Sequence, residues 1–406
     1  MQNILAFDVR SPQEGAQHAR IRMVAHVVPS RRSLHRFPAM LYAVVVASCC
    51  GIGKSGETTL KQLGVTFNGP QAVSWIDKDC FAVGRWDGTL SVFRMPAAAN
   101  EFGPVLLRAT AAPSRKAIQM VARLRPHEFV TSNDESSIVV WDMRSNQCCC
   151  STAQYPPKFG WAVSGTAVEL DGKECFVSGH ESGDILIWQV NGMKPMLLRS
   201  FSLRSPNPIK WEYQTWHIRA VVPWRENTVV TGSEDGDICL VRLPDGEILS
   251  RIRYNPAALR GINSVSICGD QVAVGNCCVG RNDKNCWLYR VSEKGFDRQD
   301  SIRLVKDDSR PQVFTFAVQL AMYSGELDFF ASTEEGQLWG GKVVNGKLRV
   351  SNELCQDVSC NYGAALAFQE QPWTLLTASH YLKLFSLGPK PVEKRPARVL
   401  VPSAKP

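Results

Sequence analysis

The sequence lacks a long hydrophobic run. Its longest apolar stretch, AMLYAVVVASCC, covers only residues 39–50. A helix that crosses a bilayer needs about 20 apolar residues, so we expect no membrane insertion.

Acidic residues are missing from positions 15–56, where several arginines occur. This composition is typical of a mitochondrial presequence, although Asp8 and Glu14 stand ahead of it and presequences are usually free of acids. We expect a cytoplasmic protein, with a mitochondrial location as the alternative.

The 14 cysteines lack the spacing of a metal site or of a disulfide framework. No Cys-x-x-Cys pair is followed by a second pair or by spaced histidines. Several cysteines are adjacent, as in Cys49–Cys50 and Cys277–Cys278, and adjacent cysteines cannot readily pair with each other. We therefore expect reduced thiols and no bound metal.

A complete phosphate-binding loop is also missing. The stretch GIGKSGETT at 51–59 contains Gly-Lys-Ser at 53–55, which resembles the end of such a loop. The loop needs a glycine five positions before Gly53, and Ser48 occupies that position. The following residues, TTLKQLGVTF at 58–67, have the pattern of a strand instead of the required helix. We expect no nucleotide and no other cofactor.

Signatures of catalysis are absent from the sequence. It contains no Gly-x-Ser-x-Gly elbow and no zinc-protease helix motif. His180 and Glu181, with Asp184 nearby, could be an acid/base or metal cluster, but their position at a predicted hairpin favours a solvated loop. The sequence therefore predicts a protein that is not an enzyme.

The abundant feature is a strand–turn–strand unit that occurs seven times. An aromatic or small apolar anchor marks the second strand of each unit, and successive anchors are 48, 47, 53, 48, 51 and 45 residues apart. The anchors are Phe93, Trp141, Trp188, Val241, Tyr289, Gly340 and Phe385. Such a period is typical of propeller blades, whose sheets bury both faces only by stacking on their neighbours.

Two further patterns support this interpretation. Each unit begins with an apolar run, such as AVSWI at 72–76 or GINSVSI at 261–267, which predicts an innermost strand between two neighbouring blades. The hairpin turns carry glycine where a tight connection favours positive φ. These glycines are Gly88, Gly183, Gly236 and Gly336.

The repeats resemble the WD-repeat family. VVWDM at 139–143 contains its name-giving dipeptide, ILIWQV at 185–190 is a close variant, and the resemblance covers about residues 70–388. The Gly-His pair usual early in each repeat is missing, and Gly179-His180 falls at a hairpin instead. We therefore expect the family's Asp-His-Ser-Trp hydrogen-bond network to be absent or incomplete in most blades.

The predicted fold is an all-β, seven-bladed β-propeller. The last unit ends after its third strand, so the resemblance implies that residues 58–67 supply its outer strand and close the ring. The predicted organisation is a basic extension over 1–57, partly strand or disordered, a propeller over 58–388, and a flexible basic, proline-rich tail over 389–406.

The resemblance implies a scaffold that mediates protein–protein interaction in a multisubunit complex. The stretch NPIKWEYQTWHIRAVVPWRE at 207–226 combines aromatic and basic residues, which anchor interfaces and can also stack on RNA bases. The candidate contacts in this stretch are Trp211, Tyr213, Trp224 and Arg225.

Two alternatives stay open. FVTSNDESSIVVWDMR at 129–144 resembles the box of WD-repeat substrate receptors of cullin-4 ubiquitin ligases, in which Arg144 would help dock the adaptor; Arg144 could equally be an ordinary surface residue. The net charge of +8, reinforced at both ends of the chain, permits an RNA- or ribosome-associated role. The expected partners are one or more proteins in a larger assembly, with RNA as a further possibility.

Overall fold

The computed structural model describes most of the repeat region. The described residues are 60–62, 70–95, 105–111, 113, 115–144, 149–209, 216–257, 260–278, 280, 283–306, 309–322, 325–355, 365–369, 374–378 and 383–387. The Gly-Lys-Ser tripeptide, the extension and tail, and the candidate contacts Trp211 and Tyr213 lie outside these residues. No helix in the described part of the chain is long and apolar enough to cross a membrane.

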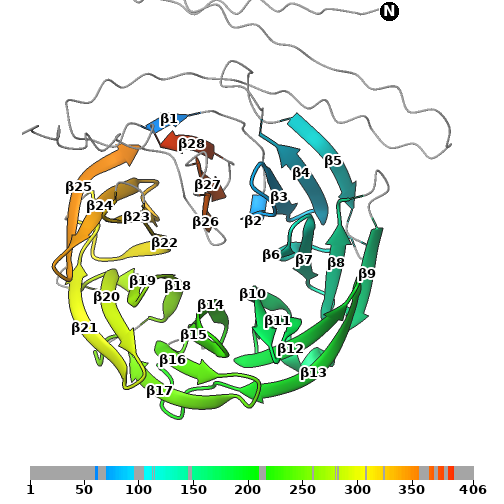
Figure 1. The fold of residues 1–406 in the computed structure, drawn as a ribbon. Coiled ribbons are helices and arrows are strands. Elements are labelled where there is room, and N and C mark those ends of the chain that lie inside the picture. The colour runs from blue at the N-terminus through cyan, green and yellow to red at the C-terminus, as the bar shows by residue number, and fades with distance from the viewer. Residues whose placement is uncertain are drawn as a thin grey trace, which may run out of the picture.

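Antiparallel four-stranded sheets are the recurring unit, and they follow one another around a ring (Figure 1). The first sheet comprises β2 (Pro70–Trp75), β3 (Cys80–Arg85), β4 (Thr89–Arg94) and β5 (Val105–Ala111). The second comprises β6 (Ile118–Arg125), β7 (Glu128–Asn133), β8 (Ser137–Asp142) and β9 (Cys149–Gln154). The third, after a 3₁₀ turn at Pro157–Phe159, comprises β10 (Ala162–Leu170), β11 (Lys173–His180), β12 (Asp184–Asn191) and β13 (Lys194–Ser202).

A regular fourth sheet comes next, and the two sets of strands after it form one eight-stranded sheet. The fourth sheet comprises β14 (Ile218–Arg225), β15 (Thr228–Ser233), β16 (Asp237–Arg242) and β17 (Glu247–Arg253). The eight-stranded sheet comprises β18 (Ile262–Cys268), β19 (Gln271–Cys278), β20 (Cys286–Ser292), β21 (Gly295–Ile302), β22 (Val313–Met322), β23 (Leu327–Thr333), β24 (Leu338–Val344) and β25 (Lys347–Cys355). Its two halves meet because Cys277 and Cys278 of β19 pair with Phe314 and Val313 of β22.

The remaining sheet combines strands from distant parts of the sequence. Its order is β1-β28-β27-β26, with β26 at Ala365–Gln369, β27 at Thr374–Ala378, β28 at Lys383–Leu387 and β1 at Leu60–Gln62. β1 pairs antiparallel with β28, so that Leu60 lies opposite Leu387 and Gln62 opposite Phe385.

The apolar anchors lie in the cores between sheets, as the repeat pattern predicts. Those of β4, β8, β12, β16 and β20 are at most 2% exposed, and each lies opposite an apolar residue of the preceding strand. The rings of Phe81 and Phe93, for example, stack with their centroids 5.1 Å apart. Gly340 has no side chain to contribute, and the large buried ring of Phe330 lies opposite it in the ladder.

The predicted turn glycines have positive φ. The values are +75° at Gly88, +84° at Gly183, +85° at Gly236 and +83° at Gly336. At Gly88 a Cβ would also come within 2.6 Å of the Arg115 backbone, so both the backbone conformation and the available space require glycine.

The prediction that His180 lies in a solvated loop is wrong. β11 extends to His180, whose side chain is fully buried, and its ring contacts Tyr155 edge-on at 4.9 Å. Trp188 Nε1 donates to Ser178 Oγ (2.9 Å), which lies 2.8 Å from His180 Nε2. The third sheet therefore contains a shortened His-Ser-Trp network, with the histidine on the strand itself.

In six inner strands, one extra residue near the start of the strand points into the centre of the ring. β2, β6, β10, β14, β18 and β22 each contain a register shift at this place. Such bulges redirect a side chain out of the ladder. The six bulge residues all line a central cavity of about 330 Å³; they are Gln71, Gln119, Val163, Arg219, Asn263 and Phe316.

Candidate functional site

The connection from β13 to β14 contains the aromatic-rich stretch that the sequence singles out. Residues 203–209 and 216–217 of this connection are described. Ile209 is buried, and Trp216 is half-buried directly before β14. The described residues therefore define the two points at which the connection is attached to the ring.

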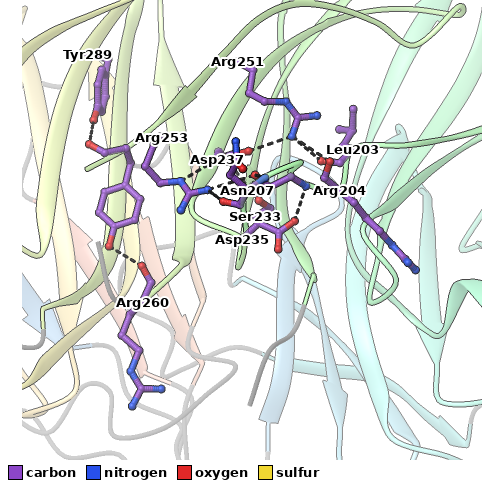
Figure 2. A network of polar contacts seen from close by, with 12 residues as sticks. Leu203, Arg204, Asn207, Ser233, Asp235, Asp237, Arg251, Arg253, Arg260 and Tyr289 are labelled. Atoms are coloured by element: carbon purple, nitrogen blue, oxygen red, sulfur yellow. Dashed lines mark hydrogen bonds and ion pairs between the residues drawn. The ribbon is translucent and has the colours of Figure 1, made fainter. Parts of the chain in front are cut away.

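Two arginines and one aspartate hold the first part of the connection (Figure 2). Asp237, at the start of β16, accepts hydrogen bonds from Arg253 Nε (2.9 Å) and Arg251 Nη1 (3.0 Å). Arg251 Nη1 also donates to the carbonyl oxygens of Leu203 (3.1 Å) and Arg204 (3.2 Å). The Asp237 carboxylate thus orients the guanidinium groups of Arg251 and Arg253, on the outer strand β17, towards the backbone of the connection.

Arg253 and Asp235 complete this clamp. Arg253 Nη2 donates to Ser205 Oγ (3.2 Å) and to the carbonyl of Asn207. Asp235 Oδ2 accepts from the backbone N–H of Ser205 (2.9 Å). Because Asp235 is almost fully buried, its pKa is raised to about 6, although this hydrogen bond and the nearby arginines favour the charged form. The clamp therefore consists of Asp235, Asp237, Arg251 and Arg253.

A tyrosine chain extends the polar contacts to the next sheet (Figure 2). The Tyr289 hydroxyl of β20 donates to the carbonyl of Tyr254, and the Tyr254 hydroxyl donates to the carbonyl of Arg260 (2.6 Å). These bonds link the end of β17 to the connection that leads into β18.

Arg204 fixes the other side of the connection. Its guanidinium lies over the Trp216 ring, 4.7 Å from the centroid, and its Nε donates to the carbonyl of Ser182 (2.6 Å). Cation–π contact of this kind stabilises an exposed arginine by about 0.5–1 kcal/mol. The two described parts of the connection are therefore joined to each other.

A buried histidine lies between two carboxylates next to Trp216. His217 Nε2 is 3.6 Å from Glu181 Oε1, and its Nδ1 is 3.5 Å from Glu234 Oε1. Glu234 also accepts from Arg219 Nε (2.5 Å). Burial raises the pKa of Glu234, but Arg219 and His217 outweigh this effect and hold it below its usual value. The cluster joins the connection to the cavity-lining residue Arg219.

Trp224 and Arg225 lie at the far end of β14 from Trp216. Eight strand residues separate the two ends, which is about 25 Å at the usual rise per residue. Trp224 Nε1 donates to Asp270 (3.1 Å), and Arg225 stacks over the Trp224 ring at 4.3 Å. The aromatic residues of the stretch 207–226 therefore lie at both ends of β14 and do not form one surface.

Arg144 forms ion pairs with two carboxylates of its own sheet. Its Nε lies 3.0 and 3.1 Å from the two carboxylate oxygens of Asp142, and its Nη2 donates to the buried Glu128. The hydrogen bonds from Arg144 lower the pKa of Asp142. More than half of the Arg144 side chain stays exposed, at 58%.

Sequence reasoning missed the clamp, although a signal for it exists. Arg251 and Arg253 stand two residues apart in an outer strand, so they point to the same face. Asp237 opens the neighbouring strand and lies opposite Arg253 in the ladder. An Arg-x-Arg pair in the last strand of a unit and an aspartate at the start of its third strand could have revealed the contact.

Antiparallel four-stranded sheets around a central cavity define this chain as a β-propeller. The comparison with solved structures specifies the type: the fold matches the crystal structure of RRP9 WD40 repeats, with a TM-score of 0.61. The match covers 81% of this chain and 98% of the RRP9 chain at 11% sequence identity. The fold is that of WD40 repeats, which confirms the resemblance seen in the sequence. No protein-family model matches the sequence, and no curated protein sequence does.

Proposed function

We propose that this chain is a non-enzymatic WD40 scaffold of a multisubunit complex, and that the connection between β13 and β14 binds a protein partner. The observation that carries this proposal is the clamp, which fixes the backbone of residues 203–207 at several points. A surface that is ordered before binding loses less conformational entropy when a partner docks.

The composition of the connection supports the same proposal. Trp211, Tyr213 and Trp216 occur within six residues of one another, together with Lys210. Tryptophan, tyrosine and arginine are the residues that most often dominate binding energy at protein interfaces.

The test is affinity purification of the tagged full chain from its own cells, followed by quantitative mass spectrometry. We expect the double variant Trp211→Ala with Tyr213→Ala to lose one set of proteins by more than about tenfold, as hot-spot residues do. The proposed surface leaves out Trp224 and Arg225, because they lie at the other end of β14; Trp224→Ala is therefore the matched control and is expected to retain that set. Equal recovery by both variants, or no enriched protein with the unmodified chain, would contradict the proposal.

We further propose that the ring has seven blades and that the N-terminal strand closes it. Two observations support this. The eight-stranded sheet contains two inner strands, β18 and β22, each with the bulge that marks an inner strand elsewhere. The β1–β28 pairing brings Leu60–Gln62 to the outer side of the last three strands.

Deletion of residues 58–67 should therefore destabilise the whole ring. Loss of the β1–β28 ladder removes about three hydrogen bonds and leaves β28 as an open edge, which we expect to lower the free energy of unfolding by about 2–4 kcal/mol. Urea denaturation followed by circular dichroism measures the change. Removal of residues 1–50, which keeps the strand, is the control; an equal effect of both truncations would argue against closure by this strand.

A further inference from the structure

The outer strands of the sheets form the outer wall of the ring and carry two features that block edge-to-edge pairing. β5, β13, β17, β21 and β25 each contain a bulge in the ladder with their inner neighbour. Each of them also contains at least one charged residue, and β1 is only three residues long and includes Lys61. Bulges, charges and short length are the usual protections of exposed strand edges.

β9 lacks all of these protections. Its six residues, CCSTAQ, pair with β8 in continuous register from Ser137–Gln154 to Asp142–Cys149. None of the six is charged, none is proline, and every side chain is exposed or half-buried. No other strand in the described part of the chain pairs with its outer edge. β9 therefore presents a flat, neutral row of backbone donors and acceptors.

The wall on both sides of β9 is unusually apolar. The outer strands β5 and β13 of the two neighbouring sheets flank β9 (Figure 1). Four of the eight large hydrophobic side chains that are exposed in the described residues lie on these two strands. They are 40–49% exposed and comprise Leu106, Leu107, Met196 and Leu198. A single extended peptide on β9 would leave these side chains uncovered, so the wall fits a partner as broad as three blades.

We propose that this wall binds a second copy of the chain by antiparallel pairing of β9 with β9. A two-fold axis that relates two such strands passes through a residue pair, so one residue lies opposite its own copy. The two central residues of β9, Ser151 and Thr152, both carry hydroxyls, and hydroxyl pairs across strands are favourable. No like charges meet anywhere along the six residues.

The same axis explains the apolar flanks. It relates the apolar flanks of one copy to those of the second, so that exposed apolar side chains lie on both sides of the paired strands. Arg199 on β13 is already paired with Asp245 (2.7 Å), which limits repulsion between the two copies there.

Sedimentation velocity of the full chain from about 1 to 100 µM, with reductant present, tests this interface. The reductant is needed because Cys149 and Cys150 are exposed and could form disulfide-linked dimers. We expect a species of twice the 45.0-kDa chain mass that grows with concentration. Thr152→Lys places two ammonium groups on one face of the paired strands and should raise the dimer dissociation constant more than about tenfold.

Ser301→Lys on β21, a bulged and charged outer strand of another sheet, is the matched control and should leave the dimer unchanged. Amide hydrogen exchange provides the positional readout, since residues 150–154 should become protected as dimer forms and lose that protection in Thr152→Lys. A single 45.0-kDa species at every concentration, or a dimer that Thr152→Lys leaves intact, would overturn the proposal.

Discussion

Asp237→Ala is expected to lower the free energy of unfolding by about 2–4 kcal/mol. The Asp237 carboxylate is nearly buried and accepts hydrogen bonds from both Arg251 and Arg253. Its removal leaves two partly buried guanidinium groups without their counter-charge, and the loss of one partner from a buried ion pair costs several kcal/mol. Denaturant titration at neutral pH measures the change, and limited proteolysis should cut faster between residues 203 and 217.

Asp245→Ala is the matched control for Asp237→Ala. Asp245 also pairs with an arginine, Arg199, but both side chains are more than half exposed. Exposed ion pairs contribute at most about 1 kcal/mol, so the free energy of unfolding of this variant should be almost the same as that of the unmodified chain. If the two alanine variants lost the same stability and resisted protease equally, the clamp would not hold the connection.

His180 is expected to make the protein sensitive to acid. Burial lowers the pKa of His180 to about 3, whereas an unfolded histidine titrates near 6.5. Between these two values the unfolded chain binds a proton that the folded chain does not. The contribution of neutral His180 to the free energy of unfolding is therefore fully present above about pH 6.5. It falls by up to about 1.4 kcal/mol per pH unit as the pH drops towards 3.

Free energies of unfolding measured from pH 7 to pH 4 test this linkage. His180→Gln should be less stable at pH 7, because it disturbs the contact with Ser178, but its stability should fall less steeply with acid. Ser178→Ala removes the same contact but keeps the buried histidine, so this variant should keep the original slope. Parallel pH profiles for the unmodified chain and His180→Gln would refute the assignment.

The features that the sequence predicts well are those encoded locally. The anchor Trp188 and the turn residue Gly88 owe their positions to the period of the repeat and to a backbone conformation that glycine adopts most easily. Both signals are complete within a few residues. For this reason the strand order within each unit follows from the sequence alone.

The contacts that the sequence leaves open depend on register and strand length. The pairing of Asp237 with Arg253 requires the exact ladder between β16 and β17. The predicted solvated environment of His180 is wrong because β11 extends to this residue. Trp216 and Trp224 are close in sequence, yet an eight-residue strand separates them in space.

The inner-strand bulges have a consequence for how this ring can change. Each bulge residue is the extra member of its ladder, and its side chain lines the central cavity. The six bulge positions therefore present different chemical groups to the channel: amides, an isopropyl group, a guanidinium and a benzyl group. The polarity of the aperture is an adjustable property that substitutions can alter one sheet at a time without rebuilding the ring.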